Sequence, residues 1–296
     1  MVVLIGSSGW SYDDWVGRFY PIEMAKKKGE WFAYYAQYFK TVEINSTFYR
    51  VPNEFTVRSW IKKASEVEGF EYSVKLPKLI THESMVKRNC ETAANQARSF
   101  EQICIEPLAE NGNMGCALIQ LSPYFRNEEI SLTTLSELLE SVSCDRYPYA
   151  VEFRHGSWLD KEKKEIVEEA REILREHGVA SVMIDGPGSP ITRAQTADHS
   201  YIRFHGRNYD IWFKDEDEDD YRINRYDYLY SIDHLKSWIP IIDEVGEKTK
   251  NVRLYFNNHG RAKAVKNAIQ MMDMLSIPHK EKEIRLQDQM KLRIYE

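Results

Sequence analysis

The segment Tyr149–Trp158 has the sequence YAVEFRHGSW, a short apolar run that carries two opposite charges. Side chains alternate between the two faces of a strand, so Glu152 and Arg154 share the face opposite to Val151. Two charges on an inner face cost free energy unless they are paired or used. The segment therefore predicts a buried strand that delivers Glu152 and Arg154 to a site.

The same pattern, a β-type run followed by a longer helical segment, repeats along the chain. The β-type runs are Val2–Ile5, Thr41–Thr47, Glu71–Leu76, Cys116–Leu121, Tyr149–Arg154, Ala180–Asp185, Tyr201–His205 and Val252–Asn257. The segments with helical periodicity are Trp31–Phe39, Phe55–Val67, Thr92–Leu108, Leu132–Val142, Lys161–His177, Tyr226–Val245 and Arg261–Leu275. Only the link Gly186–Ser200, rich in Pro and Gly, is too short for a full helix.

Eight strands alternating with helices over roughly 250 residues are typical of an α/β protein with a (β/α)8 TIM-type barrel. We expect a single domain over residues 1–285, with a parallel eight-stranded sheet and a shortened connection between strands six and seven. Residues 286–296 form a C-terminal tail in this interpretation. A doubly wound open sheet is the alternative, because periodicity does not show closure.

The composition limits the classes of partner. The 296 residues carry a formal net charge of -6, so the chain has no overall basic field for a phosphate backbone, although a local basic groove stays open. The start MVVLIGSSGW has no basic leader, and no apolar run approaches the roughly 20 residues of a membrane helix. We expect a soluble, cytoplasmic protein with no membrane partner; the sequence favours no oligomeric state.

The two faces of the predicted strands differ in polarity. The face suited to packing under helices carries Val42, Ile44, Val74, Leu76, Ile119, Leu121, Val182, Ile184, Ile202, Phe204, Leu254 and Phe256. The opposite face carries Glu43, Asn45, Thr47, Ser73, Lys75, Gln120, Glu152, Arg154, Asp185, Arg203, His205 and Asn257. A barrel interior is ordinarily filled by branched aliphatic side chains. This sequence predicts a charged interior instead.

In a barrel, the C-terminal ends of the strands converge on one mouth, where the sites of this fold lie. Those ends supply Thr47, Lys75, Gln120, Arg154, Asp185, His205 and Asn257. Three charged residues, Glu43, Glu152 and Arg203, lie one layer deeper. Because the deeper charges roughly balance, a purely structural lattice of ion pairs is an open alternative.

Several motifs, in this order, resemble the family called domain of unknown function 72. They are IGSSGWSYDDWVGRFYP, FAYYAQYFKTVEINSTFYRVP, YSVKLPKLITH, VEFRHGSW, YIRFHGR, YDYLYS and YFNNHGRAKAVKNA. The resemblance runs from the first residues to about Leu275 and implies a TIM-type barrel without an established activity. Two features look less typical of the family: Asp185-Gly186-Pro187 and the acidic insertion Asp215–Asp220.

The resemblance implies functional importance for the residues that match its motifs. They are Gly6, Trp10, Glu43, Asn45, Thr47, Phe48, Tyr49, Lys75, Glu152, Arg154, Trp158, Asp185, Arg203, His205, Gly206, Arg207, Asn257, Asn258 and His259.

The polar set is suited to an anionic ligand. Lys75, Arg154 and Arg207 would surround a phosphate or carboxylate. Glu152 or Asp185 would act as acid or base, with His205 as proton partner. The predicted catalytic residues are Glu43, Glu152, Asp185 and His205. The predicted ligand-binding residues are Trp10, Asn45, Tyr49, Lys75, Gln120, Arg154, Trp158, Arg203, Arg207, Asn257 and His259.

Aromatic residues gather in loops that follow strands: Trp10, Tyr12, Trp15, Phe48, Tyr49, Trp158, Tyr209, Trp212 and Phe213. Stacking faces beside cations suit a nucleobase or a sugar ring. The alternative is that these rings only seal the top of the barrel against water.

We therefore expect a cofactor-independent hydrolase or lyase acting on a small, anionic, ring-containing molecule. A first alternative is a protein that binds nucleotides or single-stranded nucleic acid without catalysis. A second is a divalent-metal enzyme of the xylose isomerase type, with Glu43, Glu152 and Asp185 as ligands. Neighbouring Lys and Arg side chains would compete for those carboxylates. A third is a barrel with a structural charge network and a protein partner.

Overall fold

The computed structural model describes residues 2–162, 164–187, 192–212 and 225–286. All eight predicted β-type runs contain a strand, and the sixth is divided at Val182 into two short ones. The strands are β1 (Val2–Ser7), β2 (Thr41–Ile44), β3 (Glu71–Lys75), β4 (Met114–Gln120), β5 (Tyr149–Glu152), β6 (Ala180–Ser181), β7 (Met183–Asp185), β8 (His199–Phe204) and β9 (Asn251–Phe256).

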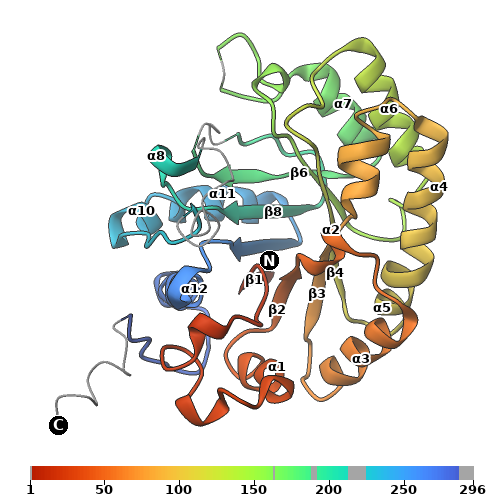
Figure 1. Ribbon diagram of the computed structural model, residues 1–296. Helices are drawn as coiled ribbons and strands as arrows, with labels where there is room; N and C mark the ends of the chain where they lie inside the picture. Colours follow the sequence, from red (N-terminus) through yellow and green to blue (C-terminus); the bar gives the residue numbers. More distant parts are fainter. Residues whose placement is uncertain (1, 163, 188–191, 213–224, 287–296) are drawn as a thin grey trace.

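Helices follow most of the strands and surround them on the outside (Figure 1). The α-helices are α1 (Trp31–Tyr35), α2 (Ser46–Tyr49), α3 (Glu54–Ala64), α4 (Cys90–Phe100), α5 (Glu106–Glu110), α6 (Glu129–Glu140), α7 (Glu168–Glu176), α8 (Tyr209–Trp212), α10 (Ile232–Lys236), α11 (Ile239–Lys248) and α12 (Lys263–Met274). The π-helices are η4 (Leu79–Ser84) and η5 (Glu101–Ile105). Short 3-10 helices are η1 (Asp13–Trp15), η2 (Ile22–Met24), η3 (Lys28–Glu30), η6 (Gly156–Trp158) and η7 (Gly260–Ala262).

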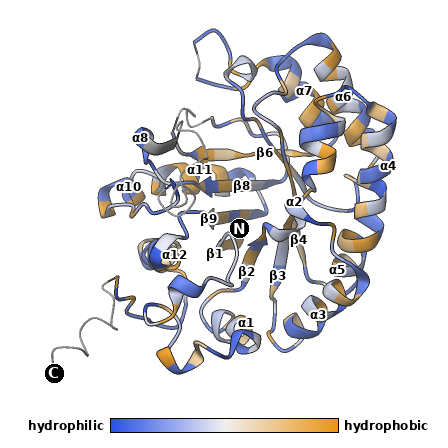
Figure 2. Ribbon diagram, viewed as in Figure 1, coloured by the Kyte–Doolittle hydropathy of each residue, from blue (hydrophilic) through white to orange (hydrophobic). Residues whose placement is uncertain are grey.

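Most helices carry both polar and apolar residues, as helices that bury one face must (Figure 2). Asparagine side chains begin two of them: Asn53 accepts a hydrogen bond from the backbone N–H of Thr56 at α3, and Asn89 from that of Thr92 at α4. None of the described helices combines the length and apolar character needed to cross a membrane.

Three predicted helices are much shorter in the structure, and the first of them, Trp31–Phe39, is helical only as far as Tyr35. The segment Lys161–His177 is helical only from Glu168, because Leu159 pairs with Ile166 in an antiparallel bridge that precedes α7. The segment Tyr226–Val245 is helical only from Ile232 and is divided into α10 and α11. Of the tail predicted to begin at Leu286, only that residue is described.

The strands form two parallel sheets, in the orders β1-β9-β8-β7 and β2-β3-β4-β5-β6. The single eight-stranded sheet that we predicted is therefore present as sheets of four and five strands. A parallel bridge between Ser8 and Glu43 links the end of β1 to β2. At the other junction, the two sheets share the run of residues 180–185 that contains β6 and β7. The described residues of the link to β8 contain no helix, as expected.

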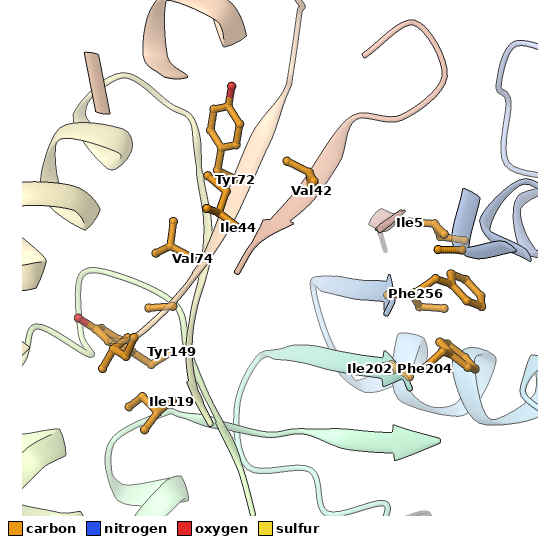
Figure 3. Close-up of a cluster of buried hydrophobic side chains, with 14 of the residues drawn as sticks. Ile5, Val42, Ile44, Tyr72, Val74, Ile119, Tyr149, Ile202, Phe204 and Phe256 are labelled. Atoms are coloured by element: carbon orange, nitrogen blue, oxygen red, sulfur yellow. The ribbon is translucent and has the colours of Figure 1, made fainter. Parts of the chain in front are cut away.

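The outward faces of both sheets pack against the helices. Figure 3 shows part of this cluster, which includes Val42, Val74 and Ile119 from one sheet and Phe204 and Phe256 from the other. All five side chains are buried to 2% exposure or less. This face is the apolar one that strand alternation predicted.

The inward faces are only partly charged. A second apolar cluster lies between the sheets and contains Cys116, Leu118, Ala150, Ala180, Val182, Ile184, Tyr201 and Tyr255. The hydroxyl of Tyr255 in β9 lies 2.6 Å from Thr41 Oγ1 in β2 and 2.8 Å from Ser73 Oγ in β3, so it joins the two sheets. The prediction of an interior that is polar throughout is therefore wrong for this layer.

The sequence prediction is also wrong about the sixth run, Ala180–Asp185, where Val182 and Ile184 were expected to pack under the helices. Val182 and Ile184 belong to the inner cluster, whereas Met183 belongs to the outer one. Asp185 consequently points away from the interior and reaches the side chain of Trp238, just before α11.

The approach of β1 to β2 depends on the absence of a side chain at Gly6. A Cβ atom at this position would lie 2.3 Å from the carbonyl oxygen of Thr41. We expect Gly6→Ala to lower the free energy of unfolding by about 1–3 kcal/mol, because the strand backbones must move apart. Urea unfolding followed by circular dichroism measures this change in the free energy of unfolding. Gly29→Ala is the control, since nothing lies within 4 Å of a Cβ there. Equal stability of the two variants would contradict a close contact at this junction.

Candidate functional site

A cavity of about 820 Å³ lies at the carboxyl ends of the strands. Strand ends contribute Lys75 from β3, Gln120 from β4 and Arg203 from β8, and residues just past the ends of strands contribute Arg154, His205 and Asn257. The described residues that line the cavity are Tyr12, Asn45, Phe48, Tyr49, Lys75, Lys78, His82, Glu83, Gln120, Ser122, Pro123, Tyr124, Arg154, Arg203, His205, Arg225, Tyr226, Asn257 and His259.

Arg203 forms the floor of the cavity together with two carboxylates. Its Nη1 donates to Glu152 Oε2 at 2.5 Å and to Gln120 Oε1 at 2.9 Å, and its Nη2 donates to Glu43 Oε1 at 2.8 Å. Ser8 and Tyr201 donate to the Glu43 carboxylate at 2.7 Å each. These three charged residues thus pair across the space between the two sheets, as their balance of charge suggested.

Both carboxylates on Arg203 are held in the ionised form. Burial by itself would raise the pKa of Glu43 and of Glu152, but Arg203 lowers both, that of Glu152 well below its ordinary value. Neither side chain has any exposed surface. They lie beneath the cavity, where they organise its floor without lining it.

Glu152 also contacts two residues that line the cavity. Arg154 Nη1 donates to Glu152 Oε1 at 2.9 Å, and His205 Nε2 lies 3.6 Å from the same oxygen. The other ring nitrogen of His205 is 3.1 Å from the amide nitrogen of Asn257. Burial and the nearby Arg203 lower the pKa of His205 to about 4, so its imidazole is neutral at pH 7.

Lys75 has the most unusual environment of the cationic residues. Its Nζ lies 3.9 Å from the centre of the Phe48 ring, and within the described residues it makes no hydrogen bond or ion pair. Burial and Arg203 lower its pKa to about 7, although Glu152 and Glu43 act in the opposite direction. Lys75 is therefore a mixture of ammonium ion and free amine near neutral pH.

The segment after β3 contributes residues that the strand pattern did not predict. It forms the π-helix η4, and Lys78, His82 and Glu83 from this region line the cavity. π-helical turns are frequent at functional sites. The ring of His82 packs edge-on against Phe48 at 4.9 Å. The only sequence signal was the position of KLPKLITH directly after a strand, where loops of this fold reach the mouth.

Aromatic rings form one wall of the cavity. Tyr12 stacks on His259 at 4.4 Å, with an angle of 8° between the rings, and Tyr226 lies 5.0 Å from the same imidazole. Burial lowers the pKa of His259 to about 4. Asn45 also lines the cavity, and its amide oxygen is buried without a hydrogen-bond partner within the described part of the chain.

The structure places four predicted site residues away from this cavity. Asp185 accepts two hydrogen bonds from Arg207 and one each from Tyr230 and Trp238, so Asp185 and Arg207 instead fix β7 to the segments after β8. Trp158 is fully buried and donates its Nε1–H to Phe125 O.

Trp10 packs edge-on against Phe32 in the core around η1 and α1. Among the other aromatics predicted for the mouth, Trp15 is fully buried and donates to the carbonyl of His259. Tyr209 begins α8 and is more than half exposed. Phe213 and the acidic run Asp215–Asp220 lie outside the described residues.

The ligand set suggested for a xylose isomerase type of metal site does not converge. Glu43 and Glu152 bind Arg203 from opposite sides, and Asp185 points out of the interior. Within the part of the chain that the structure describes, no group of three or more His, Cys, Asp or Glu is arranged to hold a metal ion.

The chain is similar to known proteins along nearly its whole length. The family model described as "Protein of unknown function DUF72" matches residues 4–291. The UPF0759 protein YunF of Bacillus subtilis (strain 168) is 25% identical over 284 residues, which are 94% of this chain and 96% of that protein. The UPF0759 protein YecE of Escherichia coli (strain K12) is 25% identical over 225 residues, which are 69% of this chain and 74% of that protein.

Two solved structures share the architecture. A DUF72 family protein from Thermotoga maritima MSB8 has a TM-score of 0.78 and 32% identity, and the match covers 93% of this chain and 100% of that one. A DUF72 family protein from Enterococcus faecalis V583 has a TM-score of 0.77 and 21% identity, and the match covers 96% of this chain and 100% of that one. At this identity the likeness shows the fold alone. Both comparisons support an α/β fold with parallel sheets.

Removing the shared cation tests the floor of the site. We expect Arg203→Met to lower the free energy of unfolding at pH 7 by about 3–5 kcal/mol, because two buried carboxylates lose their partner. Glu43 and Glu152 have folded pKa values below the ordinary 4.5. Their contribution is therefore present above that pH and lost as the pH falls through the folded values. Urea unfolding should show the difference from wild type narrowing below about pH 4.5.

Arg58→Met is the matched control, because within the described residues Arg58 pairs only with the exposed Glu54 one turn away in α3. Its stability should follow that of the wild type at every pH. A deficit of Arg203→Met that stays constant down to pH 3.5 would contradict an electrostatic role for Arg203.

Proposed function

This chain belongs to the DUF72 family, and we propose that its cavity binds an anionic, ring-containing small molecule on which it acts as a cofactor-independent hydrolase or lyase. Membership of the family confirms the resemblance carried by the sequence motifs. The family description assigns no reaction, so the proposal depends on the site. The observation that carries it is the excess of positive charge around the cavity.

Among the residues that the structure describes, five cationic side chains line the cavity, whereas one carboxylate, Glu83, does so. The cations are Lys75, Lys78, Arg154, Arg203 and Arg225. This local excess contrasts with the net charge of -6 for the whole chain. Arg203 is already shared by two carboxylates, but Lys78 is exposed at the rim and Lys75 faces the interior of the cavity. A phosphate or carboxylate group suits such a lining.

The remaining lining favours a ligand with a ring. Phe48, Tyr12 and Tyr226 present aromatic faces, and the volume of about 820 Å³ is within the range of small-molecule sites. The amide side chain of Asn45 also lines the cavity and adds hydrogen-bonding capacity for a polar group of the ligand.

Two groups at the cavity have pKa values suited to proton transfer. His205 is neutral at pH 7, and Lys75 changes its charge near that pH. Glu152 is better described as a positioning residue, because Arg203 and Arg154 occupy its carboxylate. We take the two sheets together as one (β/α)8 barrel, in which this cavity is the C-terminal mouth, the usual place for sites of this fold.

A nucleotide or the end of a single-stranded nucleic acid is a second candidate ligand. Tyr49 and Tyr124 line the rim and are 74% and 77% exposed, so their rings are accessible for stacking. Base stacking on aromatic side chains beside cations is common to such proteins. Binding without turnover would favour this alternative.

Adenosine 5′-monophosphate is a suitable probe, since it combines a ring with a phosphate. We expect calorimetry to show binding that weakens with added salt, and Arg154→Ala to raise the dissociation constant roughly tenfold, about 1.4 kcal/mol. Lys78→Ala should weaken binding in the same direction. Arg58→Ala, which removes the same charge far from the cavity, should bind as the wild type does. Absence of binding, or equal losses in Arg154→Ala and Arg58→Ala, would contradict the proposal.

The titration of Lys75 predicts how anion affinity varies with pH. Sulfate keeps its charge between pH 6 and 8, whereas Lys75 loses its positive charge as the pH rises through about 7. Sulfate should therefore bind more weakly at pH 8 than at pH 6. Lys75→Met should remove most of this pH dependence, and Lys78→Met should keep it. The same pH profile in wild type and Lys75→Met would show that another group is responsible.

A further inference from the structure

We propose that Lys75 is a nucleophile that forms an imine with an anionic aldehyde or ketone bound in the cavity. This inference rests on the proposed function, because the same cations must first hold the anion. It narrows the ligand to a carbonyl compound and the reaction to the lyase type.

The position of Lys75 is fixed by strand pairing. It is the last residue of β3, which lies between β2 and β4, and the next backbone N–H, that of Leu76, donates to Leu118 O at 2.9 Å. Thr47 Oγ1 donates to the carbonyl oxygen of Lys75 at 2.6 Å. The side chain is 8% exposed and lies against the Phe48 ring. The backbone of Lys75 is thus fixed on a rigid element, and its amine lies 3.9 Å from the centre of the Phe48 ring.

The surroundings of Lys75 favour the uncharged amine, which is the reactive form. Burial opposes the ammonium ion, and Arg203 and Arg154 repel it. Glu152 and Glu43 attract it, but both carboxylates are engaged by Arg203. Lysine side chains become nucleophilic at neutral pH when they are desolvated beside other cations. Lys78, the other lysine of the cavity, is exposed and lacks this environment.

The proposed step conserves atoms and electrons. The lone pair of Lys75 Nζ forms a bond to the carbonyl carbon, and the carbonyl π electrons move to oxygen. The two protons of the amine leave with that oxygen as water, and a carbon–nitrogen double bond remains. Protonation of this imine gives an iminium ion. No oxidant or reductant takes part.

An iminium ion explains why cations and a neutral base share one cavity. When a bond to the carbon next to the iminium carbon breaks, its electron pair forms a double bond between these two carbons, and the π electrons of the carbon–nitrogen bond move to nitrogen, which gives an enamine. If the broken bond is to hydrogen, the neutral imidazole of His205, which lines the same cavity, accepts the proton. Arg154 and Lys78 hold the anionic group of the substrate meanwhile. Return of a proton to the enamine carbon restores an iminium ion, and water then releases the product by reversing imine formation.

Pyridoxal 5′-phosphate, an anionic aldehyde with a ring, tests the inference when it is used below the protein concentration at pH 7.5. Sodium borohydride reduces any imine to a stable secondary amine, and peptide mass spectrometry locates it. We expect at least tenfold more adduct on Lys75 than on Lys78. Labelling of Lys75 should rise with a midpoint near pH 7, and an excess of adenosine 5′-monophosphate should suppress it.

Lys75→Arg keeps the positive charge but has no amine that can form this imine. Circular dichroism establishes its fold. This variant should lose the adduct but still bind adenosine 5′-monophosphate, at pH 7.5 at least as tightly as the wild type, because its side chain stays charged where Lys75 is partly neutral. Lys78→Arg should still be labelled at Lys75. Labelling spread evenly over exposed lysines, with nucleotide binding intact, would overturn the inference and leave the proposed anion site standing. Failure of both the aldehyde and the nucleotide to bind would overturn both.

Discussion

The pairing of Arg203 with two fully buried carboxylates is the constraint on which the site depends. One guanidinium joins Glu43 in β2 to Glu152 in β5, and the arginine itself belongs to β8. These hydrogen bonds therefore join β2, β5 and β8, which come from both sheets, at the level of the three side chains. A buried ion pair of this kind contributes little net stability over an apolar packing, because desolvation offsets most of the attraction. Its value lies in fixing where the residues above it point.

The same floor sets the electrostatics of the cavity. The negative charges of Glu43 and Glu152 are balanced by Arg203 and by Arg154, which donates to Glu152 from above. A further cation next to this balanced group finds no carboxylate of its own within the described residues. Lys75 is that cation: burial, together with repulsion by Arg203, lowers its pKa to about 7, and the attraction of Glu152 and Glu43 only partly opposes this. Burial and the floor together thus leave a partly neutral amine in the proposed anion site.

Strand alternation predicted the inner position of Glu43, Glu152 and Arg203, because period-two patterns survive wherever strands are regular. It failed for residues 180–185, where the ladder is interrupted at Val182 and Asp185 turns outward to Trp238. The partners of Asp185 are Arg207, Tyr230 and Trp238, which come from segments 22 to 53 residues away, and no local pattern reveals them.

The alternation of strand residues also does not predict which loop residues face the cavity. Trp158 and His82 both follow strands in the sequence, yet the first is buried against Phe125 and the second lines the cavity. Which of them faces the mouth depends on how η6 and η4 pack, and that is a tertiary effect.

Because Glu43 and Glu152 have no exposed surface, other residues must contact the ligand in the proposed chemistry. Glu152, the residue that sequence patterning singled out most strongly, has its carboxylate occupied by Arg203 and Arg154 and no surface open to a ligand. A proton acceptor must reach the reacting atoms and must be unprotonated at the working pH. Lys75 and His205 line the cavity, His205 as a neutral imidazole and Lys75 with a pKa of about 7. In the proposed chemistry the buried acids therefore act through these neighbours: Glu152 lies 3.6 Å from His205, and both acids help to set the charge of Lys75.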